Sequence, residues 1–360
     1  MSAVEMGSTS GRSKILIIVF VATALLCAAH MQFSRVWWRS EWPARWDEDI
    51  TYIWFEGYHL KHGENPYRRI DGADLRYNNK FATYLPLFYY FAAVTEYPLP
   101  WFSDWMVFWR SVSFLCFAAI GVVLFVLLLR QGMTVWAMFA LLFWCFNRWS
   151  ISILDIAHTD FVAVLLLLLS VLTLRRRRRM SLVLLGLSLG VKHIAIVLTP
   201  LYLIWIAQQT PRGRRVRELT KASSWMALVP VVISIPFLIL TPVDFLRSML
   251  FSATRVGDGH FGAPSVDVYV WSIGLSGKLF MTFLFSLLYV AAYLRKLPPL
   301  TAVFLLLLVF ADFNSVAFRQ YMVWPIPFML LAPLDLAALR PPTREDRIAE
   351  NLQPLAYSAT

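Results

Sequence analysis

Long apolar runs separated by short basic segments constrain this chain more than any other feature of its sequence. The runs Ile15 to Phe33 and Trp105 to Leu129 match the roughly 20 apolar residues that a helix needs to cross a bilayer. Backbone polar groups inside a membrane must bond within their own segment, so we expect each run to be helical. With 59% hydrophobic and only 15% charged residues, the chain has too little polar surface to cover a soluble core. The sequence therefore predicts an all-α polytopic membrane protein.

The apolar runs and the basic segments between them predict about ten transmembrane helices, some of them short. Eight runs are separate: Ile15 to Phe33, Trp105 to Leu129, Val135 to Phe146, Phe161 to Leu174, Ala222 to Leu240, Leu279 to Leu294, Leu300 to Phe318 and Gln320 to Leu336. The run from Met180 to Gln208 is too long for one upright helix, and we divide it into two helices at Lys192-His193. This division places two basic clusters, 175–179 and 212–221, on one side of the membrane. The positive-inside rule makes that side cytoplasmic, together with both termini.

The same topology predicts one membrane domain, 15–339, between a cytoplasmic tail at 1–14 and a polar tail at 340–360 that we expect to be disordered. A first outer segment, 34–104, holds the densest mixture of acids, aromatics and prolines, and a second covers 241–278. Within the first, prolines interrupt the apolar stretch Tyr84 to Val94. A full crossing there would invert every basic loop downstream, so we expect a re-entrant or interfacial helix. We therefore expect function in the helical outer loop that follows the first span.

The net charge of +11 and the three cysteines exclude several other classes of protein. Most basic residues lie in short loops between apolar runs, which is typical of topology signals rather than of a nucleic-acid surface. Cys27, Cys116 and Cys145 lie inside apolar runs, where a thiol behaves as a small hydrophobic group. The sequence predicts no nucleic-acid partner, no disulfide and no zinc site, and it leaves dependence on a divalent metal open.

Three consecutive acids open the stretch from Trp46 to Arg69, which is the first candidate for chemistry. Helical spacings of three, four and three place four polar residues on one face: Asp49, Tyr52, Glu56 and His59. Asp47 or Asp49, with Glu48 between them, is then a candidate general base or cation ligand at the outer membrane surface. In the alternative interpretation, Asp47 caps the helix while Glu48 and Asp49 complement its dipole.

Ionisable residues inside apolar runs form a second candidate site. Lys192 and His193 interrupt such a run, and a charge at a helix centre costs roughly 2.5 to 3.5 kcal/mol on insertion scales. Asp160 is the expected partner of this pair. His158 and Asp160 can act together only if they precede the first helical turn, because residues two apart do not share a helix face. The alternative is a structural ion pair or a helix break near the outer interface, where lysine can snorkel.

Three further groups of residues are open to two interpretations each. Arg319 lies between two apolar runs, and is either a topological anchor or a site residue. The glycine-rich stretch with Arg255 and His260 is either a loop that covers an acceptor or a simple connector. We interpret the five arginines from Arg175 as topology determinants that face anionic lipids rather than as a binding site.

The order of these motifs resembles that of the GT-C superfamily of membrane glycosyltransferases, and within it the mannosyltransferase branch. The matching residues are Asp47-Glu48-Asp49, Tyr52, the turn Gly63 to Arg69, Tyr84-Leu85-Pro86, His158-Thr159-Asp160, the glycine pair that precedes Lys192, and Arg319-Gln320-Tyr321 with Trp324-Pro325. The chain departs from the family pattern where Tyr84-Leu85-Pro86 lacks a doubled proline and where Lys192-His193 replaces a single lysine. The resemblance covers most of the chain and implies a GT-C-like membrane domain.

The resemblance implies an inverting enzyme that moves a sugar, with mannose expected, from a polyprenyl-phosphate donor to a glycolipid or glycan acceptor on the non-cytoplasmic face. Asp47 or Asp49 of the acidic motif, which includes Glu48, deprotonates the acceptor. Substrate-binding residues are expected at Tyr52, Tyr67, Arg68, Tyr84, His158, Asp160, Lys192, His193, Arg255, His260, Arg319 and Tyr321. No cofactor other than the lipid-linked donor is implied. The expected location is a bacterial plasma membrane, with the endoplasmic reticulum as the alternative.

Two other classes of function fit parts of the sequence. A transporter or lipid flippase would use Asp160, Lys192 and His193 as its permeation site. A non-catalytic assembly subunit would tolerate loss of the three acids from Asp47 to Asp49. No inverted repeat relates the two halves of the chain, which weighs against the commonest transporter architectures.

Overall fold

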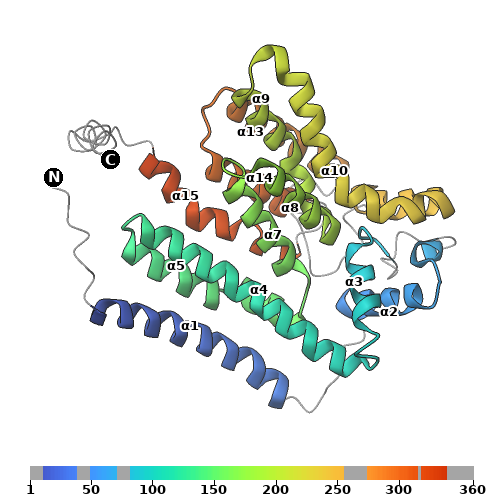
Figure 1. The fold of residues 1–360 in the computed structure, drawn as a ribbon, viewed down its shortest axis with the longest axis horizontal. Coiled ribbons are helices and arrows are strands. Elements are labelled where there is room, and N and C mark those ends of the chain that lie inside the picture. Colours follow the sequence, from blue (N-terminus) through green and yellow to red (C-terminus); the bar gives the residue numbers. More distant parts are fainter. Residues whose placement is uncertain (1–10, 39–48, 71–81, 255–273, 315–317, 339–360) are drawn as a thin grey trace, which may run out of the picture.

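The computed structural model describes residues 11–38, 49–70, 82–254, 274–314 and 318–338, and regular structure in these ranges is helical throughout (Figure 1). The first half contains α1 (Gly11–Trp38), α2 (Asp49–Lys61), η1 (Pro66–Ile70), α3 (Leu87–Thr95), α4 (Phe102–Arg130), α5 (Thr134–Phe146), α6 (Arg148–Ile156) and α7 (Asp160–Thr173). The second half contains α8 (Arg178–Val191), η2 (His193–Leu198), α9 (Thr199–Gln209), η3 (Arg212–Arg214), α10 (Arg215–Leu240), α11 (Pro242–Thr254), α13 (Gly274–Tyr293), α14 (Pro299–Phe313), η5 (Arg319–Val323) and α15 (Ile326–Ala338).

Two of the described helices are long and apolar enough to cross a membrane, and they are Phe102–Arg130 and Arg212–Leu240. The pair α5 and α6, bent by 42° at its junction, is a third candidate if it forms one span. Five shorter apolar stretches of 10–17 residues lie within the other described helices: Ile15–Met31, Asp160–Thr173, His193–Gln209, Lys278–Tyr293 and Pro299–Phe313. The all-helical prediction is confirmed for the described residues, and their apolar helices fit a membrane protein. Ten spans are not confirmed: two helices, or three spans if α5 and α6 form one, are clearly long and apolar enough to cross.

Breaks between the helices occur where polar side chains or backbone geometry require them. Lys192 adopts an extended conformation, with φ −154° and ψ 128°, so the predicted division of the long run at this residue is confirmed. Asn147 separates α5 from the unpredicted helix α6, because its side chain accepts hydrogen bonds from the amides of Trp149 and Ser150 at the start of α6. α14 ends at Phe313, five residues before the predicted end of that run.

Two glycines let α8 approach its neighbours closely. A Cβ atom added at Gly186 would lie 2.7 Å from the backbone oxygen of Met226 in α10. A Cβ atom added at Gly190 would lie 2.9 Å from the side chain of Leu87, the first residue of α3. Small residues at such positions allow helix backbones to pack in contact within a membrane. Gly186 therefore allows α8 to pack against α10, and Gly190 allows the end of α8, and with it Lys192, to pack against α3.

The outer-loop elements gather at one end of the bundle. α2 packs on α3, and η1 packs on α11. In Figure 1 these elements lie on the right, whereas the start of α1, the turn between α4 and α5 and the end of α15 lie on the left. The predicted short helix within Tyr84 to Val94 is present as α3, whose nine residues are too few to cross a bilayer. Residues 1–10, half of the second outer segment (255–273) and 339–360 lie outside the described ranges.

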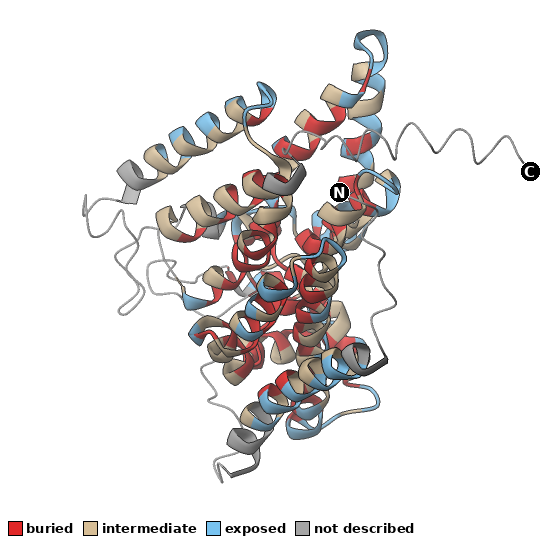
Figure 2. Ribbon diagram, turned by 90° about the vertical axis from the view of Figure 1, so that its left-hand side faces the viewer, coloured by how far each residue is buried: buried red, intermediate tan, exposed pale blue. Residues whose placement is uncertain are grey.

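Buried residues run through the centre of the bundle, and exposed residues lie on the peripheral helices (Figure 2), where many of them are apolar. On α1, Leu16 and Leu26 are exposed, and on α10, Val232 and Ile239 are exposed. Exposed apolar stripes of this kind suit contact with lipid tails rather than with water. The tertiary arrangement therefore fits the membrane character that the composition predicts.

Candidate functional site

The candidate site is built around Asp160, the first residue of α7, which is fully buried. Its carboxylate accepts hydrogen bonds from Lys192 Nζ at 2.9 and 3.0 Å and from the indole nitrogen of Trp324 at 2.5 Å. Lys192 comes from the break after α8, and Trp324 follows η5. Three segments far apart in the sequence are therefore held together by one carboxylate.

His158 connects this carboxylate to the outer-loop helix α2. Its Nδ1 lies 2.5 Å from an oxygen of Asp160, and its Nε2 lies 2.9 Å from Oδ2 of Asp49, the first residue of α2. The four charged residues form a line from Asp49 through His158 and Asp160 to Lys192. With a protonated imidazole, their formal charges sum to zero, so each buried charge has an opposite charge beside it.

Local backbone structure explains how His158 and Asp160 converge. Ala157 ends α6 in the left-handed region, with φ 51° and ψ 39°, so the chain reverses before His158 and α7 begins only at Asp160. Two residues of α4 hold this reversal. The indole of Trp109 donates to the carbonyl oxygen of Ala157 at 2.5 Å, and Arg110 donates to the last carbonyl oxygens of α6 at 2.9 and 3.1 Å. The predicted condition, that the pair precede the first helical turn, is met by His158 alone: Asp160 opens that turn, and the two side chains meet because His158 lies outside the helix.

The charge on His158 follows from its surroundings, in the connection between α6 and α7. Burial and the nearby Lys192 ammonium both lower the pKa of His158. Attraction to the Asp160 carboxylate and bonds to Asp160 and Asp49 outweigh them, so the pKa is raised above the ordinary value of histidine. A raised pKa favours the doubly protonated ring, whose two N–H groups suit the two carboxylates that it faces.

Exposure separates the roles of the four charged residues. The side chains of Asp160, Lys192 and His158 are 0%, 2% and 3% exposed, whereas that of Asp49 is 27% exposed. A group that exchanges a proton with a substrate must come within hydrogen-bond reach of it. Of these four residues, Asp49 alone presents appreciable side-chain surface, and its contact within the group is with His158.

Aromatic rings lie around Lys192. Its Nζ lies 6.0 Å from the ring centre of Tyr84 and 5.5 Å from that of Tyr321, and the Tyr84 ring lies 6.0 Å from the ring of His193. The hydroxyl of Tyr67 donates to the Tyr84 carbonyl oxygen at 2.7 Å, and Tyr67 itself is fully buried. In the structure, Tyr67 fixes the backbone that carries Tyr84.

Other predicted site residues lie outside this network. Arg68 and Arg319 are exposed, and neither guanidinium makes a hydrogen bond or an ion pair with any residue that the structure describes. Tyr52 is partly buried on α2, close to Asp49 in sequence. Asp47, Glu48, Arg255 and His260 lie outside the described residues. Within the described ranges, no group of three or more His, Cys, Asp or Glu side chains could hold a metal ion.

The predicted polar face of α2 divides between the core and the surface. Glu56 is buried, close enough to raise the pKa of Tyr67, for which burial is the larger cause. His59 instead contacts Glu64 at 2.5 Å on the outside of the helix. Sequence reasoning gave no site role to Trp324. An indole N–H within an apolar segment needs a hydrogen-bond acceptor, and this was the available signal.

Comparisons of the chain with known protein families, with curated proteins and with solved structures found no match.

Proposed function

We propose that this protein is an inverting membrane glycosyltransferase of the GT-C type, with about ten crossings and the α2–α3 end on the non-cytoplasmic side. It transfers a sugar, with mannose expected, from a polyprenyl-phosphate donor to a glycolipid or glycan acceptor. The observation that carries the proposal is the partly exposed Asp49 carboxylate, held 2.9 Å from His158 at the end of a buried ionic line. One oriented base, together with the exposed cations Arg68 and Arg319 elsewhere on the molecule, suits this chemistry.

The reaction requires one base and no separate acid. Asp49 accepts the proton of the acceptor hydroxyl as the oxygen forms a bond to the anomeric carbon of the donor sugar. The bond between that carbon and the phosphate oxygen breaks, and its electron pair leaves with the lipid phosphate. Because a phosphate departs already ionised, no acid needs to protonate it. The attack comes from the opposite face, so the configuration at the anomeric carbon inverts.

The remaining residues have positioning and binding roles in this proposal. His158 is a positioning residue, because its two nitrogens are occupied by Asp49 and Asp160 and it is almost completely buried. Asp160 contacts His158 and is itself bonded to Lys192, and in this way the pair fixes the orientation of the imidazole. Arg68 and Arg319 have exposed guanidinium groups, which suit the charged oxygens of the donor phosphate.

The transporter and flippase alternative is less well supported by this geometry. A permeation site needs ionisable groups that a substrate can reach within the membrane. Asp160 and Lys192 are buried and bonded to each other, and Trp324 takes a further position on the carboxylate. The pair therefore suits a fixed structural contact better than a binding site that opens and closes.

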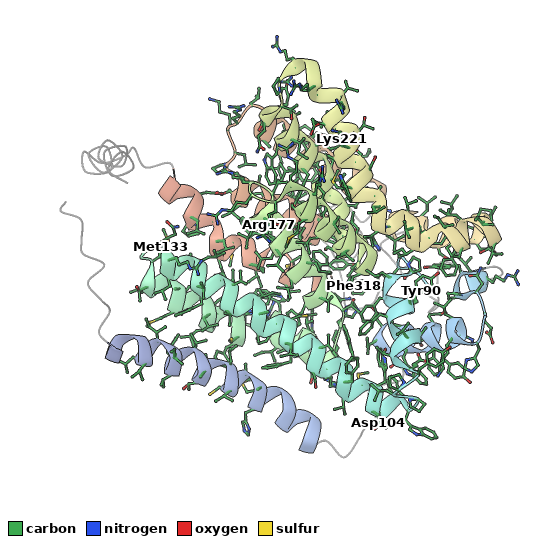
Figure 3. The ribbon with its side chains drawn as sticks, in the orientation of Figure 1. Tyr90, Asp104, Met133, Arg177, Lys221 and Phe318 are labelled. Atoms are coloured by element: carbon green, nitrogen blue, oxygen red, sulfur yellow. The ribbon has the colours of Figure 1, made fainter. Side chains whose placement is uncertain are left out.

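The test is sugar transfer by the purified full-length protein in detergent. Radiolabelled polyprenyl-phosphate mannose is incubated with a set of glycolipid acceptors, and the anomeric configuration of the product is determined. We expect a labelled glycolipid of inverted configuration. Asp49→Asn should greatly reduce this transfer. Asp104→Asn, which removes an exposed acid at the start of α4 (Figure 3), is its matched control and should retain activity. Absence of transfer from every donor tried, together with movement of the donor across vesicle membranes, would instead identify a flippase.

A further inference from the structure

Three turns meet at the end of the bundle that carries the two basic clusters. They are the α7–α8 turn, the α9–α10 turn and the α13–α14 turn. Arg178 donates to the Gln209 side chain at 3.3 Å, which joins the first turn to the second. Arg295 donates to the Gln208 carbonyl oxygen at 3.3 Å, and the Gln208 side chain donates at 2.9 Å to carbonyl oxygens at the end of α13. The end of α9 therefore holds all three turns together.

These turns form a strongly positive surface, which we call the basic rim. Its ten exposed members are Arg175, Arg176, Arg177, Arg179, Arg212, Arg214, Arg217, Lys221, Arg295 and Lys296. Glu218, in the first turn of α10, is bonded to Lys221 at 3.1 Å and lies 3.6 Å from Arg178, and Asp335 of α15 interacts electrostatically with Arg175. Five members make no hydrogen bond or ion pair through their side chains with any described residue: Arg176, Arg177, Arg212, Arg214 and Lys296. Among the described residues, the rim thus has a large excess of positive charge over acidic side chains.

Apolar surface lies beside the basic rim. α10 and α13 both pack on α9, and the three helices lie together at the top of Figure 1. α10 exposes Val231 and Ile235, and α13 exposes Leu287 and Val290. Trp225, below the rim on α10, lies under the guanidinium of Arg179 at 5.9 Å, an arrangement that suits the boundary between headgroups and tails.

From this combination we infer that the basic rim is a binding site for an anionic phospholipid, with the headgroup phosphate on the arginines and the acyl chains along α10 and α13. Arginine binds phosphate oxygens through paired N–H groups, and clustered cations attract anionic lipids. A soluble phosphate would use the charges but not the exposed apolar helices. The site is separate from Asp49, because α7 runs from Asp160 at one end to Thr173 beside the basic rim.

The rim does more in this proposal than orient the chain in the membrane. A topology signal requires only that basic residues lie on one side, wherever they fall on that side. Here the side-chain bonds of Arg178, Gln208 and Arg295 gather cations from three separate turns onto one surface. Two members of the basic rim are labelled in Figure 3: Arg177, in the α7–α8 turn, and Lys221, near the start of α10.

The experiment measures lipid retention by the full chain in neutral detergent. Purified protein is titrated with dioleoyl phosphatidylglycerol or dioleoyl phosphatidylcholine, and bound lipid is counted by native mass spectrometry. We expect preferential binding of phosphatidylglycerol. The variant Arg176→Gln, Arg212→Gln and Arg214→Gln should weaken its binding by about fivefold or more, since each cation near an anionic headgroup adds to the attraction.

A matched variant removes three exposed arginines elsewhere: Arg130→Gln, Arg148→Gln and Arg247→Gln. It has the same net charge as the rim variant, and we expect its lipid binding to stay close to that of the wild type. Equal loss in both variants, or equal binding of the two lipids, overturns the proposal. Binding of inorganic phosphate as tight as that of the lipid also overturns it, in favour of a soluble anion site. If the triple rim variant does not fold, Arg176→Gln and Arg212→Gln are compared singly with Arg148→Gln.

Discussion

Breaking the buried pair of Asp160 and Lys192 should destabilise the protein strongly. The two side chains are 0% and 2% exposed, and Lys192 Nζ has no other hydrogen-bond acceptor among the described residues. Removing one partner of a buried ion pair typically costs about 3 to 5 kcal/mol, because the remaining charge is left without compensation. We expect Lys192→Met to lie near the lower end, since His158 and Trp324 still contact Asp160. Asp160→Asn should lie near the upper end.

A double-mutant cycle measures this coupling directly. The free energy of unfolding of wild type, the two single variants and the double variant is measured by titration with SDS, followed by tryptophan fluorescence. The double variant removes both charges, so its destabilisation should be less than the sum of the two single values. We expect a coupling energy of about 2 kcal/mol or more.

An exposed pair provides the control for this cycle. Lys221 donates to Glu218 at 3.1 Å on the surface of α10, where water screens the interaction. Lys221→Met and Glu218→Gln should couple by less than about 1 kcal/mol. Additive effects at Asp160 and Lys192, with each single variant within about 1 kcal/mol of wild type, would refute the buried ionic line.

Three further predictions concern other parts of the chain. Burial raises the pKa of Glu96 from 4.5 to about 7, although Lys61 acts in the opposite direction. The folded state therefore binds this proton more tightly than the unfolded state, and the free energy of unfolding should fall as pH rises from 4.5 through 7. Glu96→Gln should remove this decline in unfolding curves measured at different pH. Gly186→Ala should destabilise the protein by about 1 to 3 kcal/mol, because the added Cβ would lie 2.7 Å from a backbone oxygen. Gly213→Ala is the control and should not destabilise it, because nothing lies within 4 Å of that Cβ. Equal unfolding midpoints for the two variants would contradict the close packing of α8 and α10. Because the pKa of His158 is raised, transfer activity should be greatest below that pKa and should be lost as pH rises through it. His158→Gln should lower the activity and flatten this pH profile. A profile that the substitution leaves unchanged would exclude the positioning role of His158.

Local signals in the sequence were enough for several features of the fold. A charged dipeptide within an overlong apolar run predicted the break at Lys192, and the need of a buried cation for a partner pointed to Asp160. The short helix α3 followed from prolines and from the topology of the basic loops. The helix α6 was missed, because an asparagine within apolar sequence gives no advance sign that its side chain will cap a helix.

The central contact of the candidate site was beyond what sequence could give. Asp49 and His158 are 109 positions apart, and no local pattern indicates that they meet. Sequence reasoning left the base open between Asp47 and Asp49, and the geometry supports Asp49 through its partner. The distance between Trp324 and Asp160 depends in the same way on how η5 packs against α6 and α7. Such contacts arise from tertiary packing rather than from spacing along the chain.

The rate of sugar transfer by Asp49→Asn, compared with wild type at saturating donor and acceptor, tests the proposed role of Asp49 most directly. The amide keeps the shape of the side chain and its contact with His158 but cannot take the acceptor proton. We predict a fall in kcat of roughly 100-fold or more, with unchanged expression and folding, since general-base catalysis contributes about that much. A kcat close to that of the wild type would contradict the assignment of Asp49 as the base.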